Sequence, residues 1–275
     1  MMRSRFPFAR VSALVALVVG AILITQRAGG VHWRVLRSGV EFATVRGEPY
    51  CRRGSSAIAA LRVDPSRVPV RVRHFTREPE RRPLDILEWQ RRTGALAVVN
   101  AGQYYADYSY MGLLASDGKV VSRIPHPTFK AALVAGPRAG GGGARVVDLT
   151  AERLDPDSLG WSEVAQSFML FDRDGTVRVR RSDQVANRTA VAEDHEGRLV
   201  VLTSEGGYTL WEFARLLQRL PLGLSQAMAM DGGLEAELVV SAGRFRYASF
   251  GQWERGRPAP TPPALLPAVV TVSAP

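Results

Sequence analysis

The sequence predicts an α+β fold: a single domain with a mixed β-sheet core that is packed by a few helices. Short apolar stretches bounded by Gly, Pro, Asn or Asp, which are typical of strands, outnumber stretches with helical periodicity. Only two segments combine a helical apolar pattern with signals for both helix ends. About 245 residues follow the first 30, a length that suits one domain with a sizeable core.

The first predicted elements are three strands, a helix and a buried strand. Glycine and proline residues separate the three strands, which span residues 40–46, 57–63 and 68–74. Pro83 begins the helix and Gly94 follows its last residue, which are the preferred positions of proline and glycine at helix ends. The apolar strand at residues 95–99 then leads directly to Asn100.

The middle of the chain alternates apolar strands with turns. Ser116-Asp117-Gly118 predicts a hairpin, and four glycines at 140–143 predict a solvated connector, because no Gly-Lys-Ser or Gly-Lys-Thr follows as in a phosphate loop. A second hairpin is expected across His195-Glu196-Gly197. The strands expected in this part span residues 112–115, 120–122, 129–135, 146–149, 189–192 and 199–202.

The clearest helix of the chain begins after Thr209. Thr209 is a suitable N-cap, and Glu212 three residues later completes a capping box. Two adjacent apolar stripes give this helix a wide face that would pack on a sheet, and Pro221 ends it. Strands at 227–230 and 238–240 follow.

Both ends of the chain are predicted to lie outside the domain, which is expected to span residues 29–256. Three arginines precede an apolar run at residues 11–24, which is typical of an export signal. The run is shorter than the roughly 20 residues of a membrane span, and no clean cleavage site follows, so residues 1–28 are either a cleaved peptide or a signal anchor. Both alternatives place the domain outside the cytoplasm, in the periplasm or secreted, and an anchor would hold it at the inner membrane. Residues 257–275, rich in Pro and Ala, are expected to form an extended tail.

The composition limits the classes of partner and cofactor. A net charge of +10 favours anionic partners, and export excludes nucleic acid among them, which leaves anionic lipid and phosphorylated glycans. The single cysteine, Cys51, allows no internal disulfide. The four histidines lack the paired spacing of a zinc site. No cofactor is required by this pattern, and Ca²⁺ or Mg²⁺ at Asp107 or Asp231 stays open.

Two buried strands each end in a polar side chain beside glycine. The run 227–230 leads to Asp231 and the pair Gly232-Gly233, and the run 95–99 leads to Asn100, with Gly102 two residues later. Glycine at a strand end lets a ligand approach the backbone, so both positions are candidate sites. A hairpin turn is the alternative for Asp-Gly-Gly.

Four ordered blocks of sequence resemble the motifs of the phosphodiester glycosidase family. They are 100–105 with 111–114 and 117–119, then 165–170, 187–192 and 207–233. The resemblance covers roughly residues 95–240 and implies an enzyme that cleaves a sugar 1-phosphodiester. One departure is Leu234-Glu235-Ala236, where the family has a small segment rich in Gly and Ser.

The resemblance and the residue chemistry together suggest roles for individual side chains. Asp231 would act as general base or stabilise the anomeric centre, and Arg188 would bind the phosphate with its planar fork. Asn100 would hydrogen-bond sugar hydroxyls or Asp231. The alternatives are a turn-closing contact for Asp231, a surface ion pair for Arg188 and a strand-end cap for Asn100. The residues expected to bind substrate are Tyr104, Tyr105, Asp107, Gln166, Ser167, Thr189, Glu205, Gly232 and Gly233.

Carboxylates near the predicted site leave further alternatives. Asp107 is a candidate second carboxylate or metal ligand. Glu235 or Glu237 could compensate for the serine that the family has after its Asp-Gly-Gly, although an outward-facing strand position is the simpler interpretation.

Three functions are consistent with the sequence. The first is an exported hydrolase that cleaves a sugar 1-phosphodiester, or a related anionic glycan linkage, in envelope or exopolysaccharide metabolism. The second is a catalytically silent glycan-binding protein of an exopolysaccharide system, which the departure after Gly233 favours. The third is a membrane-surface protein whose basic face meets anionic lipid.

Overall fold

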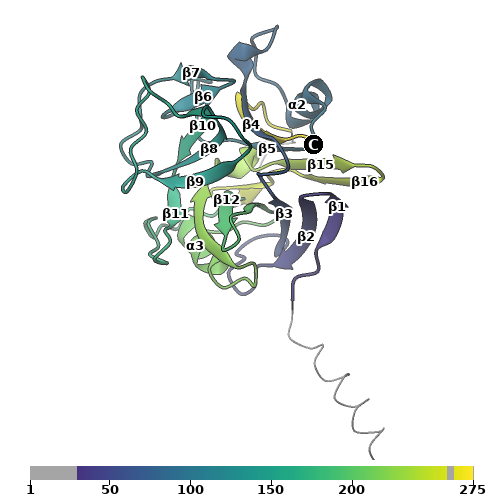
Figure 1. Ribbon diagram of the computed structural model, residues 1–275. Coiled ribbons are helices and arrows are strands. Elements are labelled where there is room, and N and C mark those ends of the chain that lie inside the picture. The colour runs from purple at the N-terminus through teal and green to yellow at the C-terminus, as the bar shows by residue number, and fades with distance from the viewer. Residues whose placement is uncertain (1–29, 259–262, 275) are drawn as a thin grey trace, which may run out of the picture. The chain divides into compact units, whose positions relative to one another are not determined.

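The computed structural model describes residues 30–258 and 263–274 (Figure 1). The predicted signal segment, residues 1–28, lies outside the described residues, and the folded unit begins at His32. Within the described part of the chain, no helix is both long enough and apolar enough to cross a membrane.

Three β-sheets and one short ribbon make up the domain. The seven-stranded sheet contains, in spatial order, β1 (Arg34–Arg37), β2 (Val40–Arg46), β3 (Ala57–Val63), β13 (Leu199–Ser204), β12 (Thr189–Asp194), β14 (Leu224–Ala229) and β11 (Met169–Phe171). One five-stranded sheet contains β7 (Lys119–Ser122), β6 (Leu114–Ser116), β10 (Trp161–Ser167), β8 (Ala131–Pro137) and β9 (Ala144–Asp148). The other contains β16 (Phe245–Ser249), β15 (Leu238–Ala242), β5 (Ala97–Asn100), β19 (Ala268–Val272) and β4 (Val70–His74). The ribbon pairs β17 (Trp253–Glu254) with β18 (Arg257–Pro258).

The predicted single-domain α+β fold is confirmed, with strands as the dominant element. The sheets are not mixed as expected, since every strand pair in the described residues is antiparallel. Short hairpins such as β6–β7, β12–β13 and β15–β16 impose this direction, because a parallel pair needs a long crossover connection.

One large apolar core receives side chains from all three sheets. Leu61 and Val191 come from the seven-stranded sheet, Leu133 from the β8 sheet, and Val99 and Val270 from the β5 sheet. All five are buried. This shared core fixes the sheets relative to one another, so residues at different strand ends can form one rigid site.

In the described residues, two α-helices pack on the outside of the sheets. In α2 (Ile86–Thr93), Asp85 Oδ1 accepts the N–H of Glu88 at 2.7 Å, and Gly94 ends the helix with φ of 60°. The helix begins three residues later than Pro83, because Leu84 forms a β-bridge with Leu266. Figure 1 shows α2 beside the sheet of β5 and β15.

The second helix, α3 (Leu210–Leu217), has the predicted N-cap. The Thr209 hydroxyl oxygen accepts the N–H of Glu212 at 3.1 Å. Two single-turn 3₁₀ helices complete the described elements: η1 (Phe75–Arg77), which follows β4, and η2 (Gly233–Glu235), which follows β14.

The C-terminal region differs from the sequence-based prediction. Residues 268–272 form β19, which is fully buried and pairs with β5 on one side and β4 on the other. The domain therefore extends beyond the expected boundary at residue 256. The Pro- and Ala-rich composition of residues 257–267 concealed a five-residue apolar strand behind it.

Candidate active site

Asp231 lies in a tight turn between β14 and η2. Its N–H donates to the carbonyl of Ala101 at 2.9 Å, and its Oδ1 accepts the N–H of Gly232, also at 2.9 Å. The turn has no room for a side chain at Gly232, where a Cβ atom would lie 2.7 Å from the carbonyl oxygen of Asn187. Gly233 has φ of 73°, which favours glycine. Both glycines are therefore required by the backbone path that presents Asp231.

Asn100 holds this turn from behind. Its Nδ2 donates to the main-chain carbonyl of Asp231 at 2.9 Å, and its Oδ1 accepts the hydroxyl of Thr189 at 2.8 Å. Both side chains are buried. The predicted contact of Asn100 with Asp231 thus exists, but it is made to the main chain, and the hydrogen-bonding groups of Asn100 and Thr189 are engaged inside the protein.

Two glutamates accompany Asp231. Glu235, in η2, accepts a hydrogen bond from the hydroxyl of Tyr104 at 3.1 Å. Burial raises the pKa of Asp231 to about 7, the negative charges of Glu235 and Glu254 add to the rise, and the N–H of Gly232 and the charge of Arg188 oppose it. Burial, followed by the charge of Glu254, also raises the pKa of Glu235. These three side chains form what we call the carboxylate cluster.

Arg188 is the cation next to this cluster. Its Nε donates to the carbonyl of Tyr208 at 2.9 Å and its Nη2 to that of Gln184 at 2.6 Å. Its remaining Nη1 faces the turn, where it would lie 3.3 Å from a Cβ on Gly232. Burial lowers the pKa of Arg188 to about 10, an effect that the charge of Asp231 opposes. At neutral pH the guanidinium is therefore charged, and main-chain contacts fix its direction.

Glu254 was not predicted from the sequence. It lies in β17. Hydrogen bonds from Asn187 connect this strand to the glycine turn, because Asn187 Oδ1 accepts the N–H groups of Gln252 and Trp253 at 2.8 and 2.7 Å. The carbonyl of Asn187 also accepts the N–H of Gly233 at 3.0 Å. No local motif marks Glu254, and the only sequence signal was Asn187, inside the block that contains Arg188.

Several residues expected to bind substrate are instead internal. Gln166 is buried, and its Oε1 accepts the N–H groups of Leu113 and His126 at 2.8 and 2.9 Å. Ser167, also buried, donates to Gln103, whose Nε2 donates to the carbonyl of Met230. Gln166 and Ser167 therefore support the strands that carry the site and do not line it.

The remaining predicted residues lie outside the carboxylate cluster. Tyr105 is 51% exposed, and Asp107 is exposed with its Oδ1 accepting the N–H and hydroxyl of Ser109 at 2.9 and 2.6 Å. Glu205 accepts hydrogen bonds from Ser55 at 3.0 Å and from Tyr247 at 3.2 Å. Of the predicted aromatic pair, Tyr104 alone contacts the cluster.

A metal ion has no evident set of ligands here. The parts of the chain that the structure describes contain no group of three His, Cys, Asp or Glu side chains that could hold one. What the site offers instead is a half-buried carboxyl with a raised pKa, two further carboxylates, a tyrosine hydroxyl and one fixed guanidinium.

Comparisons with known proteins identify the family and the fold of the chain. A family model for phosphodiester glycosidase matches residues 93–265. The catalytic domain of zebrafish N-acetylglucosamine-1-phosphodiester alpha-N-acetylglucosaminidase, in a form auto-inhibited by its pro-peptide, is similar in fold with a TM-score of 0.59 and 16% identity, covering 91% of this chain and 85% of that one. A hypothetical protein from Synechocystis has the same TM-score and 14% identity, covering 90% of this chain and 64% of that one. No curated protein sequence matches the chain.

Proposed function

Because the chain belongs to the phosphodiester glycosidase family, we propose that it hydrolyses a sugar 1-phosphodiester at Asp231. The observation that carries this proposal is the carboxyl of Asp231, whose pKa is raised to about 7 beside Glu235 and Arg188. A carboxylate with a pKa near neutrality is an efficient general base, because it is both available and basic enough to accept a proton.

The proposed reaction breaks the bond between the anomeric carbon and the phosphate oxygen. Ionised Asp231 accepts a proton from a water molecule, whose oxygen bonds to the anomeric carbon. The electron pair of the broken bond leaves with the phosphate oxygen, which gives a free sugar and a phosphomonoester. Phosphate is a good leaving group, so the reaction needs little general-acid assistance.

The other groups of the site have distinct tasks in this reaction. The negative charges of Glu235 and Glu254 stabilise the positive charge that develops at the anomeric centre. Arg188 neutralises the phosphate, for which its planar donors are suited. Tyr104 holds Glu235 through its hydroxyl and can present its ring to a sugar.

We also propose that the enzyme acts outside the cytoplasm. The support is the sequence of residues 1–28, where arginines precede the apolar run 11–24. An anionic glycan of the envelope or of an exopolysaccharide is a suitable substrate class for a protein with a net charge of +10. Attachment to the inner membrane depends on whether residues 1–28 stay on the chain.

The direct test is hydrolysis of UDP-N-acetylglucosamine and a small panel of sugar 1-phosphodiesters by the full-length protein. We expect turnover that falls by about 10²–10⁴-fold in Asp231→Asn, because loss of a general base has effects of this size. Asp174→Asn is the matched control, since Asp174 is exposed and lies outside the site. Circular dichroism would show that both variants are folded.

The result separates the enzyme from the alternative of a catalytically silent glycan-binding protein. Equal turnover by Asp231→Asn and by the native protein would exclude Asp231 as the base. Absence of turnover on the whole panel, with sugar binding that Asp231→Asn alters only in affinity, would favour the binding protein.

A further inference from the structure

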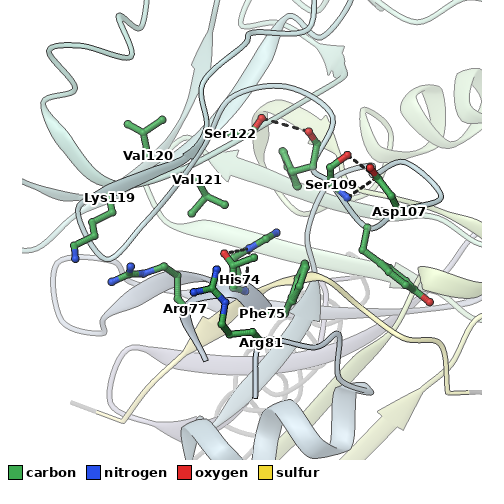
Figure 2. A pocket seen from close by; sticks show the side chains of 13 residues that line it. His74, Phe75, Arg77, Arg81, Asp107, Ser109, Lys119, Val120, Val121 and Ser122 are labelled. Atoms are coloured by element: carbon green, nitrogen blue, oxygen red, sulfur yellow. Dashed lines mark hydrogen bonds between the residues drawn. The ribbon is translucent and has the colours of Figure 1, made fainter. Parts of the chain in front are cut away.

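A cavity of about 510 Å³ lies between η1, β7 and the loop 107–110. Figure 2 shows Arg77, Arg81 and Lys119 gathered at one end of it, with Val120 and Val121 along the wall. Asp107 and Ser109 lie at the opposite end. We call this the basic cavity. None of the residues to which the proposed reaction assigns a role lines it.

The three cations of the basic cavity are not neutralised by the protein. All three are exposed, and among residues 30–258 and 263–274 no hydrogen bond or ion pair is formed by their side chains. Asp107 is the one carboxylate among the lining residues, and both donors of Ser109 already bind it. Like charges held together without a counter-charge favour binding of an anion.

His74 also lines the basic cavity. Its Nδ1 accepts the N–H of Thr76 at 3.3 Å, which places the proton of the neutral ring on Nε2. Nε2 is buried and has no hydrogen-bond partner, and burial lowers the pKa of His74 to about 4, so that the ring is neutral at physiological pH.

An aromatic pair connects the basic cavity with the carboxylate cluster. Tyr108 lines the cavity and stacks on Tyr104 with ring centroids 5.9 Å apart and planes inclined by 28°. Tyr104 in turn donates to Glu235 in the carboxylate cluster. Aromatic faces are favourable surfaces for sugar rings, so one glycan chain can contact both places.

We propose that the basic cavity binds an anionic sugar unit of an extended glycan, whose cleaved linkage lies at Asp231 and whose intervening sugars cross Tyr104 and Tyr108. The ligand class is an oligosaccharide carrying carboxylate or phosphate groups. The inference rests on the proposed function for the position of the cleaved bond, and the cavity itself is tested by binding alone.

The experiment is calorimetric titration of the full-length protein with tetragalacturonate, glucose 6-phosphate and the neutral sugar maltotetraose. The test variant is Arg77→Gln/Arg81→Gln/Lys119→Gln. The matched control, Lys130→Gln/Arg180→Gln/Arg244→Gln, removes the same charge at exposed positions outside the cavity. Tetragalacturonate and glucose 6-phosphate distinguish carboxylate from phosphate as the source of the charge.

We expect at least one anionic sugar to bind and its Kd to rise by about tenfold or more in the test variant, because several charge-assisted contacts are lost. The control variant should stay within about twofold, and Asp231→Asn should retain binding. Equal loss in both triple variants would overturn the proposal, since it would show general charge attraction. Binding of maltotetraose with the same affinity as the anionic sugars would also overturn the proposal. In a further titration, binding of phosphatidylglycerol vesicles that depends on the three cations, without binding of any sugar, would overturn it as well.

Failure of this proposal can be told apart from failure of the proposed function. Absence of anionic-sugar binding with hydrolysis intact removes the basic cavity alone. Binding that depends on the three cations, in a protein without turnover, keeps the basic cavity and removes the hydrolase.

Discussion

At the scale of single residues, the ionisation of Asp231 governs the proposed chemistry. The carboxyl must be deprotonated to accept a proton from water, and burial with the charges of Glu235 and Glu254 raises its pKa to about 7. The reaction should therefore be sensitive to pH close to neutrality, where an ordinary surface aspartate is fully ionised.

We predict that kcat/KM rises with pH through a midpoint near 7. Glu235→Gln removes a charge that raises the pKa of Asp231, so the midpoint should move to lower pH in this variant. A pH–rate profile from pH 5 to 9 measures both effects, with Asp174→Asn as control. A rate that falls as pH rises through 7 would show that Asp231 acts as an acid.

The shape of the turn at Gly232 gives a second prediction at this scale. Gly232→Ala would place a Cβ 2.7 Å from the carbonyl oxygen of Asn187 and next to Arg188. We expect a loss of about 1–3 kcal/mol in the free energy of unfolding, as for other overpacked positions. Gly160→Ala, with open space around the new Cβ, should change it by less than about 0.5 kcal/mol. Urea denaturation measures both, and equal stability of the two variants would contradict the crowding at Gly232.

Sequence reasoning pointed to the residues of the glycine turn and to Arg188 but not to Glu254, which reaches the turn from β17. Asp231, Gly232 and Arg188 follow from strand-end and motif patterns. Glu254 does not, because its position depends on the hydrogen bonds between Asn187 and residues 252–253. For Asn100, the sequence pattern predicted the position of a polar side chain at a strand end. It could not show that this side chain would contact the main chain of Asp231 and the hydroxyl of Thr189.

At the scale of elements, β19 is the strand with the largest consequence for stability. It is buried along its length and pairs with both β4 and β5. The preceding segment is fixed as well, since the indole N–H of Trp89 in α2 donates to the carbonyl of Leu266 at 2.9 Å.

We predict that Val270→Ala lowers the free energy of unfolding by about 2–3 kcal/mol, because the substitution removes buried methyl groups and leaves a cavity. Val35 in β1, which is 67% exposed, provides the matched control, and Val35→Ala should cost less than about 0.5 kcal/mol. Chemical denaturation of both variants checks this. A loose tail at residues 257–275 would instead make the two substitutions equivalent.

Elements with strong local signals were predictable, and those that depend on distant partners were not. The caps at Thr209 and Gly94 involve neighbouring residues only, so the sequence contains the whole signal. The strand β19 is stabilised by β4 and β5, about 170–200 residues earlier in the chain, which no local pattern records. The start of α2 shifted for a similar reason, since Leu84 pairs with Leu266.

At the scale of the whole molecule, buried ionisable groups make stability depend on pH. Burial raises the pKa of Glu237 to about 8, with the main-chain N–H of Ala264 opposing this rise, and the carboxyl is fully buried in the domain. In the unfolded chain a glutamate titrates near 4.3. Between these values the folded state binds more protons than the unfolded state, so stability is lost as pH rises.

We predict that the melting temperature falls as pH rises from about 6.5 to 8.5, through Glu237 and, in the same direction, Asp231. Below pH 6.5 the lowered pKa of His74 acts in the opposite sense, because the unfolded chain then binds the extra proton. Glu237→Gln should flatten the decline above pH 6.5. A melting curve series in matched buffers tests this, and an unchanged slope in Glu237→Gln would assign the effect to other groups.

The place of β19 in its sheet also bears on when the domain can form during synthesis. The strand is translated after every other strand of the domain, yet it lies between β4 and β5, and β4 has no other partner in the sheet. A nascent chain that has not reached Val272 therefore presents two open strand edges and an uncovered apolar layer. This sheet can therefore be completed only after β19 has been synthesised, and chains truncated before residue 272 would expose edges of the kind that promote aggregation.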